Sequence, residues 1–88
     1  MAHTFSLSIL TPEKTVFEGP VEYVEVPGAE GYLGVLANHA PLVTSLATGT
    51  ITLRHASGTT ELWSVSGGFF EVSSNQATVL ADSVTKAG

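Results

Sequence analysis

The chain has 88 residues, no cysteine, and eight acidic residues against three basic ones, which gives a formal net charge of −5. This length predicts one domain spanning residues 1–88, and the absence of cysteine excludes disulfides, thiolate chemistry and the usual structural zinc sites. Three cations cannot line a phosphate-tracking surface, so the composition argues against nucleic acid and against direct adsorption to anionic lipid.

The apolar residues near the N-terminus follow the two-residue period of a β-strand. Phe5, Leu7 and Ile9 alternate with polar neighbours, and the turn signal Thr11-Pro12 ends the run. This pattern predicts a half-buried strand.

The next part of the chain keeps this period and then becomes rich in turns. Thr15–Val26 predicts a second strand pair, with a bulge or tight bend at Gly19-Pro20. Val26–Leu46, VPGAEGYLGVLANHAPLVTSL, places two glycine-bearing turns and a histidine–proline turn between short apolar runs. Glycine and proline geometry fixes such a backbone, so we expect shaped loops here.

The C-terminal half is also strand-like. Ile51–His55 and Glu61–Ser66 flank a Ser-Gly turn and predict a hairpin, and Gly67-Gly68 is expected to separate it from the next strand. Ala77–Ala81 is a further short apolar run. Turn signals recur about every 8–12 residues, and no window shows a sustained helical stripe. The sequence therefore predicts an all-β fold, a single β-sandwich of roughly eight to ten short strands.

An enzyme would need a nucleophile, a base and an orienting acid, for which Ser66, His39 and Asp82 are the candidates. The chain has no G-x-S-x-G elbow, and Ser66 lies inside an expected strand. Domains of this size rarely offer the cleft of about 300 Å³ that a substrate needs. We therefore expect no catalytic residues.

The three histidines, His3, His39 and His55, match no metal-ligand spacing. We expect His39 to make a local hydrogen bond in its turn and His55 to be a strand-end or partly buried residue. No metal site is predicted.

A phosphate loop could be sought at Gly28, Gly31 and Gly34. Such a loop needs a following helix and a basic or acidic partner, whereas strands follow here and no Lys or Arg lies between residues 14 and 54. No cofactor is expected. The same loop carries Glu30 and Tyr32, which the pattern leaves open as either a protein-contact patch or a solvated loop.

The Val26–Leu46 motif closely resembles the signature of the epsilon subunit of rotary F-type ATP synthases, called delta in mitochondria. Thr48–Ile51 follows at the matching place, Val65–Val72 is similar to the family's glycine-glycine strand pair, and Val79–Asp82 resembles its closing strand. The resemblance runs from Phe5 to Asp82, nearly the whole chain.

This resemblance implies a sandwich of about ten mostly antiparallel strands and a mechanical, non-catalytic role in a proton-translocating ATP synthase. The family's domain grips the gamma subunit at the foot of the central rotor and rests on the c-ring, so these two are the expected partners. The chain shows no signal peptide and no apolar run of about 18 residues. We therefore expect a peripheral location on the cytoplasmic face of the bacterial plasma membrane, held through the complex.

Carried over residue by residue, the resemblance implies a ring-facing surface made of two loops, Ala29-Glu30-Gly31-Tyr32 and Asn38-His39-Ala40-Pro41. Basic residues in the family's ring loops make Glu30 the expected electrostatic partner. The expected gamma contacts are Thr11 and Thr44.

The chain departs from the family pattern in three places. Tyr32 stands where an acid is common, Ala37 stands where proline is common, and the sequence stops at Gly88. Most bacterial relatives continue into a two-helix hairpin that inhibits ATP hydrolysis in many of them and binds ATP in some, so we expect a form without this hairpin. The alternative is a free-standing sandwich that binds sugar or peptide, although Trp63 and Phe70 are placed for a core rather than a binding platform.

Overall fold

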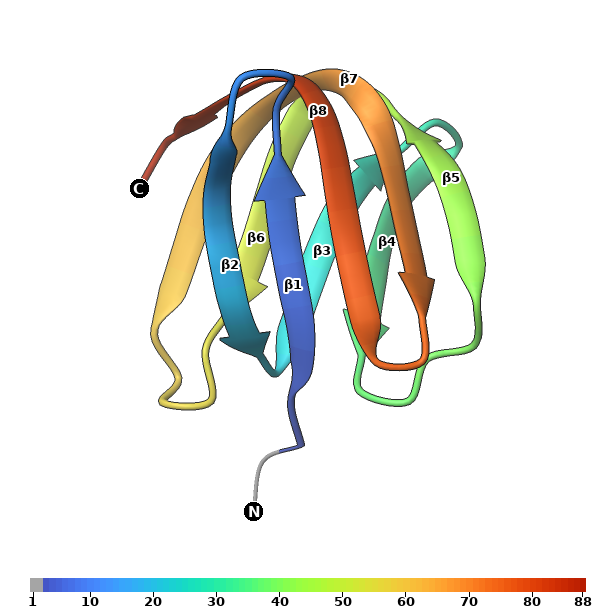
Figure 1. The fold of residues 1–88 in the computed structure, drawn as a ribbon, viewed down its shortest axis with the longest axis vertical. Helices are drawn as coiled ribbons and strands as arrows, with labels where there is room; N and C mark the ends of the chain where they lie inside the picture. The colour runs from blue at the N-terminus through green and yellow to red at the C-terminus, as the bar shows by residue number, and fades with distance from the viewer. Residues whose placement is uncertain (1–2) are drawn as a thin grey trace.

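The computed structural model describes residues 3–88, which form eight β-strands and, within that range, no helix (Figure 1). The strands are β1 (Phe5–Leu10), β2 (Thr15–Val21), β3 (Tyr23–Gly28), β4 (Gly31–Leu36), β5 (Leu42–Leu46), β6 (Gly49–Arg54), β7 (Thr60–Ser73) and β8 (Gln76–Lys86). Every ladder is antiparallel except the one between β1 and β8. Nothing in residues 3–88 forms a helix of the length and apolarity that a membrane crossing requires.

The strands form one sheet that folds over into the two layers of a sandwich (Figure 1). One layer runs β2-β1-β8-β7-β5, and the other runs β4-β3-β6 and continues into β7. β7 belongs to both layers because its first half pairs with β6 and its second half pairs with β5. The all-β, mostly antiparallel prediction is confirmed.

β7 changes layer at Gly67-Gly68, where both glycines have positive φ, 71° and 123°. The ladder to β8 includes Ser66↔Ser83 and Gly68↔Ala81 but omits the pair between them, so both strands bend together. The expectation that these glycines separate two strands is wrong. Because β7 and β8 each pass through the bend as one strand, residues 3–88 form eight strands rather than about ten.

β2 also differs from the predicted pattern. It continues through Gly19-Pro20, and the chain breaks instead at Glu22. Pro20 lies opposite Ser6 on β2, which is a strand at the edge of the sheet. Proline has no N–H to donate, but on an edge strand this position can face solvent, so no neighbouring strand loses a hydrogen bond.

The core lies between the layers and consists of the inward-facing residues of the alternating runs. Trp63 is 9% exposed and Phe70 0%, which confirms that both belong to the core. The buried apolar set also contains Phe5, Leu7, Ile9, Val21, Val24, Val26, Val35, Leu46, Ile51, Leu53, Val65, Val72, Ala77, Val79 and Ala81.

Candidate functional site

The first predicted contact loop is the tight turn between β3 and β4. Gly28 and Gly31 pair across the turn, which leaves Ala29 and Glu30 exposed at its tip. Gly31 has a φ of 132°, which a residue with a side chain rarely adopts. The Ala29 N–H donates to the carbonyl of Ser45 at 2.9 Å, so the tip is fastened to β5. Glu30 is therefore presented on a fixed, exposed turn.

Tyr32 follows this turn and braces it against β6. The residue is 56% exposed, but its hydroxyl oxygen accepts the N–H of Thr50 at 3.0 Å. A Cβ at Gly49 would lie 2.6 Å from the same hydroxyl oxygen and 2.7 Å from Cβ of Pro27, so only glycine fits beneath it. The Tyr32 hydroxyl therefore makes an internal hydrogen bond, while the exposed part of the side chain stays accessible to a partner.

The second predicted contact loop, Asn38-His39-Ala40-Pro41, connects β4 to β5. The Asn38 N–H donates to Oδ1 of Asn75 at 2.6 Å, and Nδ2 of Asn75 donates to Oδ1 of Asn38 at 3.1 Å. His39 Nδ1 donates to the carbonyl of Ala40 at 2.6 Å, which confirms the expected local hydrogen bond. No sequence motif singles out Asn75 as a partner of this loop. The only sequence signal is its position after Ser74 in a short turn, and in the structure its φ is 60°.

These two loops lie at opposite ends of β4 (Figure 1). A strand rises about 3.3 Å per residue, so the six residues of β4 separate the loops by roughly 20 Å. The two loops predicted to face the ring are therefore not adjacent to each other, and their contact with a ring stays a prediction.

Thr11 and Thr44, the expected gamma contacts, also lie apart. Thr11 is in the β1–β2 turn, at the same end as the β3–β4 turn, and lines a hollow of about 230 Å³ beside Phe69 and Leu80. Thr44 pairs with Phe70 and lines a different hollow, the groove between β4 and β5. The two threonines do not define one patch.

An apolar row crosses the outer face of the β1-β8-β7-β5 layer. Leu80 and Phe69 are cross-strand neighbours with 48% and 57% exposure, and Val43 on β5 is 70% exposed. We call Leu10, Leu80, Phe69 and Val43 the outer apolar row. The sequence holds one signal for it, because only one of two consecutive phenylalanines in a strand can face inward.

The structure does not assemble the residues considered for catalysis or metal binding. Ser66 is exposed beside Ser83 on β8, Asp82 lies over Gly67, and no hydrogen bond among residues 3–88 joins either of them to His39. Nor do any three acidic or histidine side chains in that part of the chain gather as metal ligands would.

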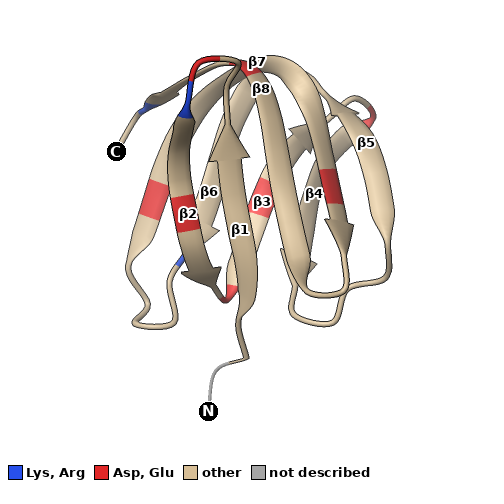
Figure 2. Cartoon of the chain, viewed as in Figure 1, with Lys and Arg blue, Asp and Glu red and all other residues tan. Residues whose placement is uncertain are grey.

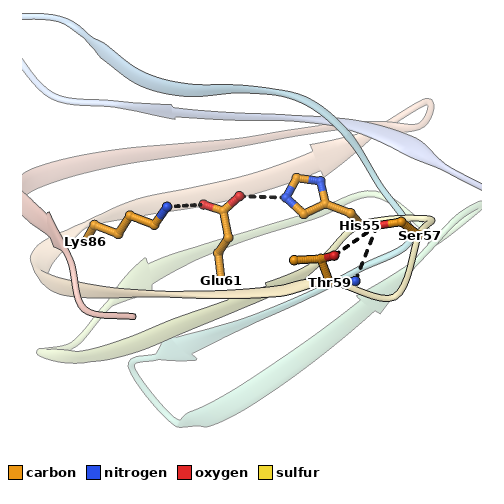
Figure 3. A network of polar contacts seen from close by, with 5 residues as sticks. All are labelled: His55, Ser57, Thr59, Glu61 and Lys86. Carbon is orange, nitrogen blue, oxygen red and sulfur yellow. Dashed lines mark hydrogen bonds and ion pairs between the residues drawn. The ribbon is translucent and has the colours of Figure 1, made fainter.

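A polar cluster joins the β6–β7 turn to β8 (Figure 3). His55 Nε2 donates to Oε2 of Glu61 at 2.6 Å, and Nζ of Lys86 lies 3.5 Å from Oε1. The His55 hydrogen bond holds the pKa of Glu61 below its usual value; burial opposes this shift, and the Lys86 charge assists it. His55 is half-buried at the end of β6, as expected, with its ring 5.9 Å from that of Phe17. This cluster fastens chain segments together.

The basic residues are confined to one side of the molecule, which carries acidic residues as well (Figure 2). All three basic residues, Lys14, Arg54 and Lys86, lie on the side that holds β2, β6 and the C-terminus (Figure 2). The opposite side, with the β3–β4 turn and the second half of β7, carries Glu30 and Glu71.

Residues 4–87 match the profile of the ATP synthase delta/epsilon chain, beta-sandwich domain. The chain belongs to this family. The ATP synthase epsilon chain of Desulforamulus reducens is 46% identical over 87 residues, covering 99% of this chain and 65% of the relative. The epsilon chain of Desulfitobacterium hafniense is 45% identical, covering 93% and 61%. The family is a domain of an ATP synthase subunit, so the chain is classed with a part of a larger enzyme and not as an enzyme by itself. The chain spans less than two thirds of the length of these relatives.

Solved structures share the family's fold. A chain in the Euglena gracilis mitochondrial ATP synthase, solved as OSCP, F1 and c-ring, superposes with a TM-score of 0.90 at 24% identity, covering 94% of this chain and 53% of that one. A chain in the Tetrahymena thermophila mitochondrial ATP synthase central stalk and c-ring gives 0.78 at 15% identity, covering 96% and 67%.

Proposed function

We propose that this chain is a non-catalytic rotor subunit of a proton-translocating F-type ATP synthase, and that it binds the gamma subunit and the c-ring. The observation that carries the proposal is the family match over residues 4–87, together with relatives that are ATP synthase epsilon chains. The single domain of residues 1–88 would then transmit torque without chemistry of its own.

The ring contact is assigned to the β3–β4 turn. Glu30 is exposed on a turn that two glycines and a hydrogen bond to β5 hold in place, so its charge has a defined position. The surrounding side of the molecule carries acids while the basic residues lie elsewhere, which suits a basic partner loop (Figure 2). The Asn38–Pro41 loop lies at the other end of β4 and is left out of this contact.

The gamma contact is assigned to the outer apolar row. Exposed apolar groups gathered on one face commonly mark protein interfaces. Phe69 and Leu80 border the hollow that Thr11 also lines, so the row lies next to one of the two expected gamma positions. The row lies on a face of the sandwich and the β3–β4 turn at its end, so both partners can be bound together.

The location follows from these partners. The relatives described above are bacterial proteins, and a subunit held by gamma and the ring would be peripheral on the cytoplasmic face of the plasma membrane. The net charge of −5 does not favour direct binding to anionic lipid, so the complex would supply the attachment.

The ring contact is tested by Glu30→Lys in membranes that contain the assembled synthase. We expect proton-driven ATP synthesis to fall several-fold, because a like charge now meets the basic loop. Glu18→Lys, which makes the same change at an exposed position on β2, serves as the matched control and should leave synthesis unchanged. Wild-type synthesis with Glu30→Lys would overturn the assignment of the ring contact.

The broader proposal is tested by mixing the purified chain with the gamma subunit. A complex that survives gel filtration supports a rotor subunit. A chain that stays free of gamma but binds sugars or peptides would instead be a free-standing binding module.

A further inference from the structure

A groove of about 580 Å³ runs along the side of the sandwich between β4 and β5. β5 reaches the β3–β4 turn by pairing with Gly28 at the end of β3, and β4 and β5 diverge away from the turn (Figure 1). Leu33 and Leu42, both half-buried, pack against the core and line the groove. The groove therefore has an apolar floor between two strand edges.

The β4 edge that borders this groove has no neighbouring strand. Among residues 3–88, β4 pairs with β3 alone. The two-residue turn makes Gly28↔Gly31 a hydrogen-bonded pair. Along an antiparallel ladder, hydrogen-bonded pairs alternate with non-hydrogen-bonded pairs, whose N–H and C=O groups point away from the partner strand. The N–H and C=O groups of Tyr32, Gly34 and Leu36 therefore point away from β3, toward the open side.

The β4 edge also lacks the features that usually prevent strand addition. Edge strands are commonly protected by charged residues or proline. β2, an edge of the other layer, has both, in Glu18 and Pro20. β4 has neither, and its outward side chains Tyr32 and Leu36 are apolar and more than half exposed.

The charge around the groove indicates the chemistry of its occupant. Glu30 lines the groove at the turn, and no basic residue is among the described residues that line the groove. The three basic residues lie on the other side of the molecule (Figure 2). A second copy of this chain, also at −5, is therefore a poorer electrostatic match than a basic segment.

We propose that the β4 edge is a strand-addition site for an extended, basic segment of a partner protein. The segment pairs antiparallel with β4, its inward apolar side chains cover Leu33 and Leu42, and a Lys or Arg lies beside Glu30. The inference rests on the proposed function only in taking a protein as the occupant.

The test is an NMR titration of the isotope-labelled full chain with a short blocked peptide that alternates valine with lysine. In an antiparallel pair, directly opposite residues point to the same face of the sheet. Tyr32 and Leu36 point outward, so the peptide is expected to place its lysines opposite Tyr32, Gly34 and Leu36. Its valines then point inward, toward the groove. We expect the amide signals of these three residues to shift and their hydrogen exchange to slow.

Two isomeric peptides isolate the backbone contribution. N-methylation at the lysines removes the N–H groups that bond to β4, and binding should weaken about tenfold or more. N-methylation at the valines removes N–H groups that face away from β4, and affinity should stay within about threefold of the parent peptide. A peptide with glutamate in place of lysine should not bind.

Equal affinity of the two methylated isomers would overturn the proposal, and so would shifts on β2, the absence of binding, or dimerisation of the chain through β4. These results are separable from those that bear on the rotor role. A chain that binds no peptide but forms the complex with gamma loses the edge proposal alone, whereas a chain that binds peptide and never assembles with gamma loses the rotor proposal.

Discussion

Glu61 Oε2 accepts a hydrogen bond from His55 Nε2 at 2.6 Å, and Lys86 Nζ lies 3.5 Å from the other carboxylate oxygen. The His55 bond lowers the pKa of Glu61, the Lys86 charge adds to the effect, and burial opposes it. A carboxylate whose pKa is lower in the folded than in the unfolded chain stabilises the fold above its unfolded pKa of about 4.5, and this stability is lost as pH falls through the folded pKa.

The first prediction is therefore that Glu61→Gln flattens the acid side of the stability profile. Urea unfolding at a series of pH values should show the free energy of unfolding of the wild type falling more steeply below about pH 4.5 than that of the variant. Glu18→Gln, a change at an exposed carboxylate on β2, is the control and should keep the wild-type slope. Parallel profiles for wild type and Glu61→Gln would contradict this account of the cluster.

Gly68→Ala should prevent folding. A Cβ at Gly68 would lie 2.0 Å from the carbonyl oxygen of Leu80 and 2.8 Å from Cα of Ala81, and its φ of 123° already disfavours a side chain. Gly58→Ala is the matched control: its φ is 95° but nothing lies within 4 Å, so we expect only the backbone cost of about 1–3 kcal/mol. Thermal unfolding should show a folded Gly58→Ala and a Gly68→Ala that is unfolded or destabilised by more than about 4 kcal/mol. Equal melting temperatures would contradict the role given to the bend.

The same bend shows how far the sequence could predict the fold. Alternation along Phe5–Ile9 and Ile51–His55 follows from which face is buried, so these strands were predictable. A Gly-Gly pair, however, indicates a break and a continuous bend equally well. The choice depends on β8, whose ladder continues on both sides of the pair and keeps β7 intact.

The contact surface was predictable in part. Glycines around Glu30 indicate an exposed turn, and the structure has one there. The distance between the Ala29–Tyr32 turn and the Asn38–Pro41 loop depends on the residues between them forming a fully extended strand, and the motif does not specify this. The edge at β4 depends on which strands are neighbours, which is a property of the complete topology.

Tyr32→Phe tests whether this side chain braces the turn. The hydroxyl accepts the Thr50 N–H at 3.0 Å, so its removal should lower the free energy of unfolding by about 0.5–1.5 kcal/mol. The Gly28–Gly31 pair and the Ala29–Ser45 hydrogen bond remain, so the fold and the exposed position of Glu30 should persist. Tyr23→Phe is a suitable control, because its hydroxyl makes only a 3.4 Å contact with Glu25 and should contribute less. A Tyr32→Phe chain as stable as the wild type would show that the hydroxyl does not hold the turn.

Phe69 and Phe70 form a matched pair on adjacent positions of β7. Phe69 is 57% exposed in the outer apolar row, while Phe70 is fully buried and opposes Val79 in the core. Phe70→Ala should cost about 3–5 kcal/mol, a large share of what a domain this small has. Phe69→Ala should change the free energy of unfolding by less than about 1 kcal/mol, yet weaken the complex with the gamma subunit at least tenfold, because exposed aromatics supply much of an interface's affinity.

Denaturant titration and gel filtration of each variant with gamma separate these effects, since loss of folding and loss of binding fall on different residues. A Phe69→Ala chain that binds gamma as the wild type does would remove the outer apolar row from the interface. The gamma contact would then have to be sought elsewhere, beginning with Thr44, which lines the groove beside β5 and faces away from the row.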